Sequence, residues 1–118
     1  MNSNETWSGG TPLIFNGNYY SATGGPIGIG GPSANASPYV VVFPGWNNQR
    51  EDVIDVQKTK AVFGPMKLTT NAVSPGVSAV GQLVCISGGQ FVPSVSGLFV
   101  GVVEEVIGGG FVTISTFY

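Results

Sequence analysis

Histidine is absent from the 118 residues of this chain, and cysteine occurs only once. Without histidine the chain lacks the usual general base near neutral pH and the commonest metal ligand, so a Ser-His-Asp triad is excluded. One cysteine forms no intramolecular disulfide and does not supply the Cys and His cluster of a zinc site. We therefore expect a protein that is not an enzyme, with no catalytic residue, no cofactor and no bound metal.

The single cysteine, Cys85, lies in the apolar run Gln82–Ile86. This setting is typical of a small hydrophobic residue buried in a strand. An intermolecular disulfide or a reactive thiol are the alternatives, but no positively charged residue adjoins Cys85 in the sequence to activate it.

Charge is also scarce. Charged residues make up 8% of the chain, with a net charge of −2, whereas a typical soluble domain has about 25%. Four scattered cations are too few to neutralise nucleic-acid phosphates or to bind an anionic membrane surface. We expect no nucleic acid, membrane or small-molecule substrate as partner. Because a lone domain stays soluble through a charged surface, the shortage favours a surface covered by protein partners or built from uncharged polar residues.

Long apolar runs are missing too. The longest, Tyr39–Pro44 and Leu98–Val103, have the length of a strand, far short of a membrane-spanning helix. Met1 is followed by small and polar residues, not by the basic and then apolar leader of a secretory signal. These features predict a chain that is made and kept in soluble form.

Glycine, proline, asparagine and serine dominate the N-terminal third. Residues 1–38 contain eight Gly, four Pro, five Asn and five Ser, and their single charge is Glu5. The stretch Ser21–Pro38 has neither helical nor strand periodicity. Because glycine is costly to order and proline removes a backbone donor, this stretch does not build a core of its own. We expect an extended N-terminal arm over residues 1–38, followed by a compact β domain over residues 39–118.

Apolar side chains are nevertheless spaced through this arm, as expected of anchors that dock into another protein surface. One hypothesis is that the arm lies across a neighbouring subunit. The alternative is that its aromatic residues fold back on the body. The candidate partner-binding residues, four in the arm and one in the body, are Trp7, Phe15, Tyr19, Tyr20 and Trp46.

From Tyr39 onward, short β-prone runs alternate with turn signals such as Gly88-Gly89 and Gly108–Gly110. No segment predicts a helix. The pattern predicts an all-β fold, a small β-sandwich or partly closed, β-tulip-like barrel. The clearest expected strands are Tyr39–Phe43, Met66–Thr70, Gln82–Ile86, Gln90–Val92, Leu98–Val106 and Phe111–Phe117.

Two groups of acidic residues and one glycine-rich stretch need an interpretation. Residues 50–60 hold six of the ten charges; they form either a solvated edge or a site for calcium or a charged partner, although the spacing does not match a calcium loop. Glu104 and Glu105 are adjacent, which on a regular strand places them on opposite faces. Gly24–Gly31 resembles a phosphate loop only superficially, because Pro26 and Pro32 break the required strand–loop–helix context.

The C-terminal part resembles the small β domains of tailed-bacteriophage head decoration, or cement, proteins. The residues that carry the resemblance are a "G-x-L-V" strand, an "F-x-G-V" strand and a terminal "G-G-x-V-x-V" type hairpin. In this chain the first motif is Gly81–Val84, the second lies in Leu98–Glu105 and the third in Gly108–Ile114. Gln90–Pro93, between the first two, also belongs to the resemblance. The resemblance covers about forty residues, a third of the chain, and the glycine-rich arm has no counterpart in it.

The resemblance implies a structural protein, made in the host cytoplasm, that binds the outer surface of an icosahedral phage head. Its partner would be the major capsid protein, whose subunit contacts it would stabilise, and it would assemble as a homo-oligomer, with a homotrimer favoured. Two alternatives stay open: a fibre, tail or pilus-like structural subunit, and a carbohydrate-binding β module in which Trp7 and Trp46 form stacking platforms.

Overall fold

The computed structural model describes residues 6–7, 9–32, 34–42, 49–50, 61–62 and 64–118. These residues form eleven β-strands and no helix, as the sequence predicts. The strands belong to separate antiparallel sheets whose strand orders run from one edge to the other without closing into a barrel. The all-β prediction is confirmed, and of the two architectures expected, the unclosed sheets correspond to the small β-sandwich and not to the partly closed barrel.

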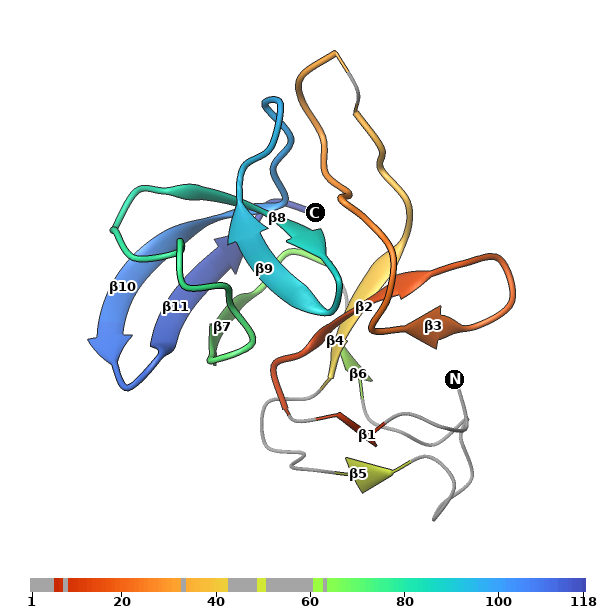
Figure 1. Ribbon diagram of the computed structural model, residues 1–118, viewed down its shortest axis with the longest axis horizontal. Coiled ribbons are helices and arrows are strands. Elements are labelled where there is room, and N and C mark those ends of the chain that lie inside the picture. Colours follow the sequence, from red (N-terminus) through yellow and green to blue (C-terminus); the bar gives the residue numbers. More distant parts are fainter. Residues whose placement is uncertain (1–5, 8, 33, 43–48, 51–60, 63) are drawn as a thin grey trace.

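The larger sheet has five strands in the order β7-β11-β10-β8-β9 (Figure 1). It contains the two glycine-turned hairpins that the sequence predicts. Its strands are β7 (Lys67–Thr70), β8 (Leu83–Ser87), β9 (Gln90–Pro93), β10 (Gly101–Gly108) and β11 (Phe111–Thr116). Each lies within a few residues of its predicted range because period-2 alternation and the Gly turns are local signals.

The second sheet has four strands in the order β3-β2-β4-β6. Only β4 (Tyr39–Val42) is among the strands expected most clearly from the sequence; β2 (Pro12–Phe15), β3 (Tyr20–Ser21) and β6 (Ala61–Val62) complete the sheet. A separate two-stranded ladder joins β1 (Thr6–Trp7) to β5 (Gln49–Arg50). The apolar run of β4 is buried along its whole length, as is typical of a strand with both faces covered.

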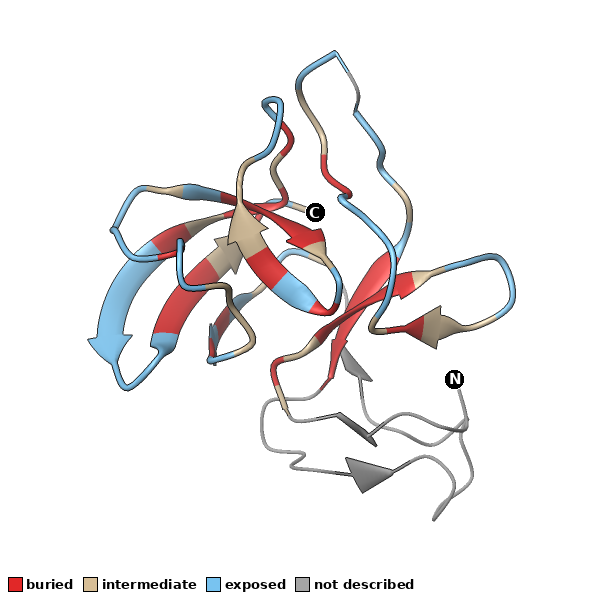
Figure 2. Ribbon diagram, in the orientation of Figure 1, coloured by how far each residue is buried: buried red, intermediate tan, exposed pale blue. Residues whose placement is uncertain are grey.

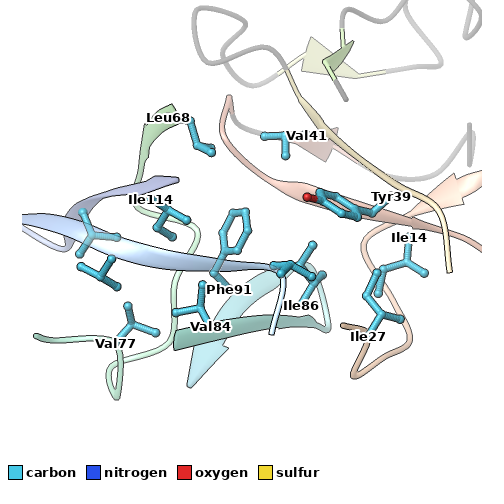
Figure 3. Packing of buried hydrophobic residues seen from close by; sticks show 13 residues of the cluster. Ile14, Ile27, Tyr39, Val41, Leu68, Val77, Val84, Ile86, Phe91 and Ile114 are labelled. Carbon is cyan, nitrogen blue, oxygen red and sulfur yellow. The ribbon is translucent and has the colours of Figure 1, made fainter. Parts of the chain in front are cut away.

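The hydrophobic core lies between the two sheets (Figures 2 and 3). Its largest completely buried side chain is Phe91 of β9. Both sheets contribute, since the cluster consists of Ile14, Ile27, Tyr39, Val41, Leu68, Val77, Val84, Ile86, Phe91, Val100, Val103, Val112 and Ile114. A smaller cluster, Leu13, Val40 and Val42, lies on the other face of β4.

Residues from the expected arm belong to this core. β2 pairs with β4 from Pro12↔Val41 to Ile14↔Tyr39. Ile27 exchanges two backbone hydrogen bonds with Ile86 of β8, at 2.8 and 3.2 Å. The pairing of β2 and the burial of Ile27 thus place parts of residues 1–38 in the core of the body.

Residues 27–29 are joined by backbone hydrogen bonds to segments that are distant in the sequence. Ile29 exchanges two backbone hydrogen bonds with Phe99, both 2.9 Å. Because these bridges are isolated, they leave no strand periodicity in the sequence. They satisfy backbone groups of Ile27, which is buried, and of Ile29, which is partly buried, as burial requires.

Candidate interaction surface

Two of the five aromatic residues proposed as partner-binding residues form a pair. Phe15 of β2 lies opposite Tyr20 of β3, with ring centroids 5.1 Å apart, and both are half-buried. Tyr19 is half-buried in the same turn, where its N–H donates to Asn16 Oδ1 at 3.1 Å. Their partner-binding role stays a prediction.

The two tryptophans give no structural evidence on binding. Trp7 lies in β1, where its backbone pairs with Gln49, and its side chain lies outside the described part of the structure. Trp46 and most of the charged segment 50–60 also lie outside the described residues, so the alternatives for that segment stay open.

The sequence did not identify the most exposed apolar element of the large sheet, the tip of the β10–β11 hairpin. We call residues 104–111 the hairpin tip. Within it, Val106, Ile107 and Phe111 keep 45%, 52% and 41% of their surface exposed. All eight residues of the tip are exposed, in contrast to the mostly buried residues of 100–103 and 112–114 (Figure 2). The available signal was an apolar strand interrupted by two adjacent glutamates.

The hairpin tip owes its shape to irregular pairing. The β10–β11 register shifts between Val103 and Glu105 and again between Val106 and Gly108, and each shift inserts one extra residue into β10, as in a β-bulge. Glu104 is therefore an extra residue, and the expectation that Glu104 and Glu105 alternate as on a regular strand does not apply. Bulges increase the local twist and bend the strand.

One edge of β10 is paired only over its first residues. β8 pairs with β10 at Gly101 and Val102, and Val103 then exchanges hydrogen bonds of 2.8 and 2.9 Å with Gly81 and Gln82. From Glu104 to Gly108, within the part of the chain that the structure describes, no backbone hydrogen bond joins this edge to another segment. We call this stretch the free edge.

A groove lies between the hairpin tip and the loop of residues 71–78. Its volume is about 370 Å³, at the lower end of the size of ligand pockets. Val77 and Val112 are core residues that line it, Val106 and Phe111 contribute from the tip, and Asn71 and Ser74 are among its few polar groups. The groove can take one large apolar side chain of a partner.

Charge on the described surface is concentrated at the hairpin tip. Among side chains that the structure describes, only Lys67, Glu104 and Glu105 are charged, and all three are exposed. The tip is therefore acidic and apolar. No group of three Cys, Asp or Glu side chains that could hold a metal ion occurs among the described residues.

Cys85 is buried in β8, as the sequence predicts. Burial raises the pKa of its thiol, which opposes formation of the reactive thiolate. Its Sγ lies 3.7 Å from the carbonyl oxygen of Pro93. The thiol is thus a buried packing group next to the end of β9.

Within the described part of the chain, no helix is long and apolar enough to cross a membrane. No protein-family model, no curated protein and no solved structure matches this chain.

Proposed function

We propose that this protein is a structural capsid decoration protein, which binds the outer surface of an icosahedral phage head and stabilises contacts between major capsid subunits. The observation that carries the proposal is the exposed apolar hairpin tip with Val106, Ile107 and Phe111. This tip lies inside the stretch of sequence that resembles head decoration proteins, which spans β8 to β11.

The physical mechanism is burial of apolar surface at seams between capsid subunits. Exposed apolar residues that cluster on one element mark interaction sites, and the few charges of this chain leave little to oppose docking. Each copy contributes a modest contact. Three copies in a trimer bind far more tightly than one, because the second and third contacts form at high effective concentration.

Immunogold electron microscopy tests the proposal on virions purified from the culture that produces the protein. We expect gold on the outside of icosahedral heads, at regular positions. Gold on tails, fibres or filaments would support a fibre or tail subunit instead, and absence of gold from intact particles would overturn the proposal.

A pair of variants tests the docking element in a co-sedimentation assay with expanded heads stripped of the protein. Replacing Val106 and Ile107 by serine should lower head binding by about tenfold or more, since apolar anchors dominate interfaces. Val95→Ser is the matched control, because Val95 is 45% exposed, as Val106 is, and lies outside the tip. Equal binding by both variants would remove the tip from the contact.

A further inference from the structure

The free edge of β10 has the geometry of a strand-addition site. Residues 104–108 belong to β10 and face β11 on one side, with bulges at Glu104 and Ile107. On the other side the last bonds join Val103 to Gly81 and Gln82, the residues that precede β8. A strand edge presents a row of N–H and C=O groups that can pair with another chain. Because residues 104–108 face only Phe111, Val112 and Thr113 of β11, they offer about 10 Å of edge at roughly 3.3 Å per register position, which is enough for a very short added strand.

Apolar contacts accompany this backbone edge. Val106 and Ile107 lie on the free edge. Val80 directly precedes Gly81 and Gln82, which bond to Val103 where the free edge begins, and it is 66% exposed. The groove of about 370 Å³ opens beside the tip, where Val106 and Phe111 line it. Strand addition draws affinity from backbone hydrogen bonds and specificity from side-chain pockets of this kind.

Charge decides between the possible occupants. A second copy would bring another Glu104 and Glu105 to the same edge, which like-charge repulsion disfavours. In addition, three exposed side chains on a hairpin tip fall far short of the roughly 1,200 Å² that a stable dimer interface buries. A segment with lysine or arginine instead complements the two glutamates, for which the structure describes no ion-pair partner.

We infer that the free edge of β10 binds an extended partner segment in which apolar and basic residues alternate, and that this segment adds as a strand in the position that β8 leaves. One apolar side chain of the segment enters the groove between the hairpin tip and the loop 71–78. The identity of the partner rests on the proposed function: on a phage head, the segment belongs to the major capsid protein.

The test uses the isolated full-length protein and two capped five-residue peptides, one alternating valine and lysine, the other valine and glutamate. Titrations are followed by ¹⁵N–¹H NMR at about 10 mM salt, where charge interactions are weakly screened. We expect saturable shifts and slowed amide exchange at residues 104–108 with the lysine peptide, and roughly tenfold weaker binding of the glutamate peptide.

Charge variants separate a specific contact from general attraction. Glu104→Gln with Glu105→Gln should bring the affinities for the two peptides within about twofold of each other, and lysine at both positions should reverse the preference. Asn18→Lys with Ala36→Lys, at exposed sites elsewhere, is the control matched in net charge to the double glutamine variant, because two added lysines equal two removed glutamates, and it should keep the original preference.

Blocking the backbone tests strand addition itself. Ile107 is the extra residue of a bulge and has no partner in the β10–β11 register, so Ile107→Pro removes one N–H from residues 104–108 without removing a register pair. We expect it to abolish binding of the lysine peptide, whereas Ile107→Ala should weaken binding only severalfold. Unchanged far-UV circular dichroism of both variants serves as the check on folding.

Several outcomes would overturn the inference. These are absence of saturable shifts at residues 104–108, equal affinity of the wild-type protein for both peptides, and shifts that appear at 104–108 on raising the protein concentration alone, which would indicate self-pairing. The peptide assay contains no capsid. Failure here with intact head binding would reject the partner segment only, and peptide binding without head labelling would reject the capsid assignment only.

Discussion

Phe91 shows how much of the core depends on single side chains. It is the largest side chain that is completely buried, and its backbone holds the loop after β7 in place through bonds with Ala72 and Ser74 of 2.8 and 3.0 Å. Removing its ring would leave a cavity between the two sheets.

We predict that Phe91→Ala lowers the free energy of unfolding by about 3–5 kcal/mol. Urea denaturation followed by tryptophan fluorescence measures this change. Val95→Ala is the control, because Val95 is exposed, and its effect should stay within about 0.5 kcal/mol. A loss below about 1 kcal/mol for Phe91→Ala would contradict the packing described for the core.

Tyr39 joins the two sheets through its side chain. Its hydroxyl donates a hydrogen bond to the main-chain oxygen of Tyr118 at 2.5 Å, and the two rings meet edge to face with centroids 5.6 Å apart. Burial raises the pKa of Tyr39 to about 12, although a hydrogen bond with Thr116 lowers it in part. The folded state therefore favours the neutral phenol.

The sign of the pH dependence follows from this shift. A phenol whose pKa rises on folding from 10 to about 12 contributes stability that is complete below pH 10 and is lost as pH rises toward 12. We predict that Tyr39→Phe flattens the decline of stability between pH 10 and 12 relative to the wild type. Urea midpoints measured from pH 8 to 12 test this, and an unchanged slope would contradict the assignment.

The same substitution also has an effect at neutral pH. Tyr39→Phe should cost about 1 kcal/mol at pH 7, the net value of one hydrogen bond. Tyr118→Phe is the matched control, since the Tyr118 hydroxyl is buried without a hydrogen-bond partner among the described residues, and its removal should cost less than Tyr39→Phe does.

At the scale of elements, β10 is the strand whose two halves have different surroundings. Its first residues lie between β8 and β11, and Gly101 is paired with both Val84 and Thr116. A Cβ atom on Gly101 would come within 2.5 Å of the carbonyl oxygen of Ser115. Only glycine permits this close approach of β11 to β10.

We predict that Gly101→Ala destabilises the protein by about 2–3 kcal/mol, because the added methyl group has to displace backbone. Thermal unfolding followed by circular dichroism measures the change. Gly17→Ala is the comparison: Gly17 has a φ of +103° and open space around it, so its cost of about 1 kcal/mol comes from the backbone conformation alone. Equal costs would count against the close contact.

At the scale of the whole molecule, the two sheets are not independent units. β4 has β2 as its neighbour on one side and β6 on the other, and two isoleucines of the N-terminal segment, Ile14 and Ile27, lie in the main core. A chain that begins at Tyr39 would lose a central strand of the second sheet together with both side chains.

We predict that a fragment of residues 39–118 fails to fold cooperatively, because the loss of two buried isoleucines and a paired strand exceeds the stability of a small domain. Near-UV circular dichroism and size-exclusion chromatography should show lost tertiary signal and an expanded chain. Adding a synthetic peptide of residues 9–38 should restore part of the signal. Native-like unfolding of the fragment alone would contradict the shared core.

The sequence by itself determined the fold class and the C-terminal strands. Alternating residues in Phe111–Thr116 and the glycine turn before it are local signals, and each strand face could be assigned from them. Burial of Cys85 followed from the apolar run around it. The absence of a helix among the described residues agrees with the scarcity of any 3.6-residue periodicity.

Only the tertiary structure decided the place of the N-terminal segment and the form of the candidate site. Ile27 is buried because it pairs with Ile86, almost sixty positions later, and no local pattern encodes such a pairing. The bulges at Glu104 and Ile107 depend on how β11 meets β10. Sequence periodicity describes a regular strand, but the exposed edge of β10 arises from where its neighbour β8 begins, which is set by contacts between segments far apart in the chain.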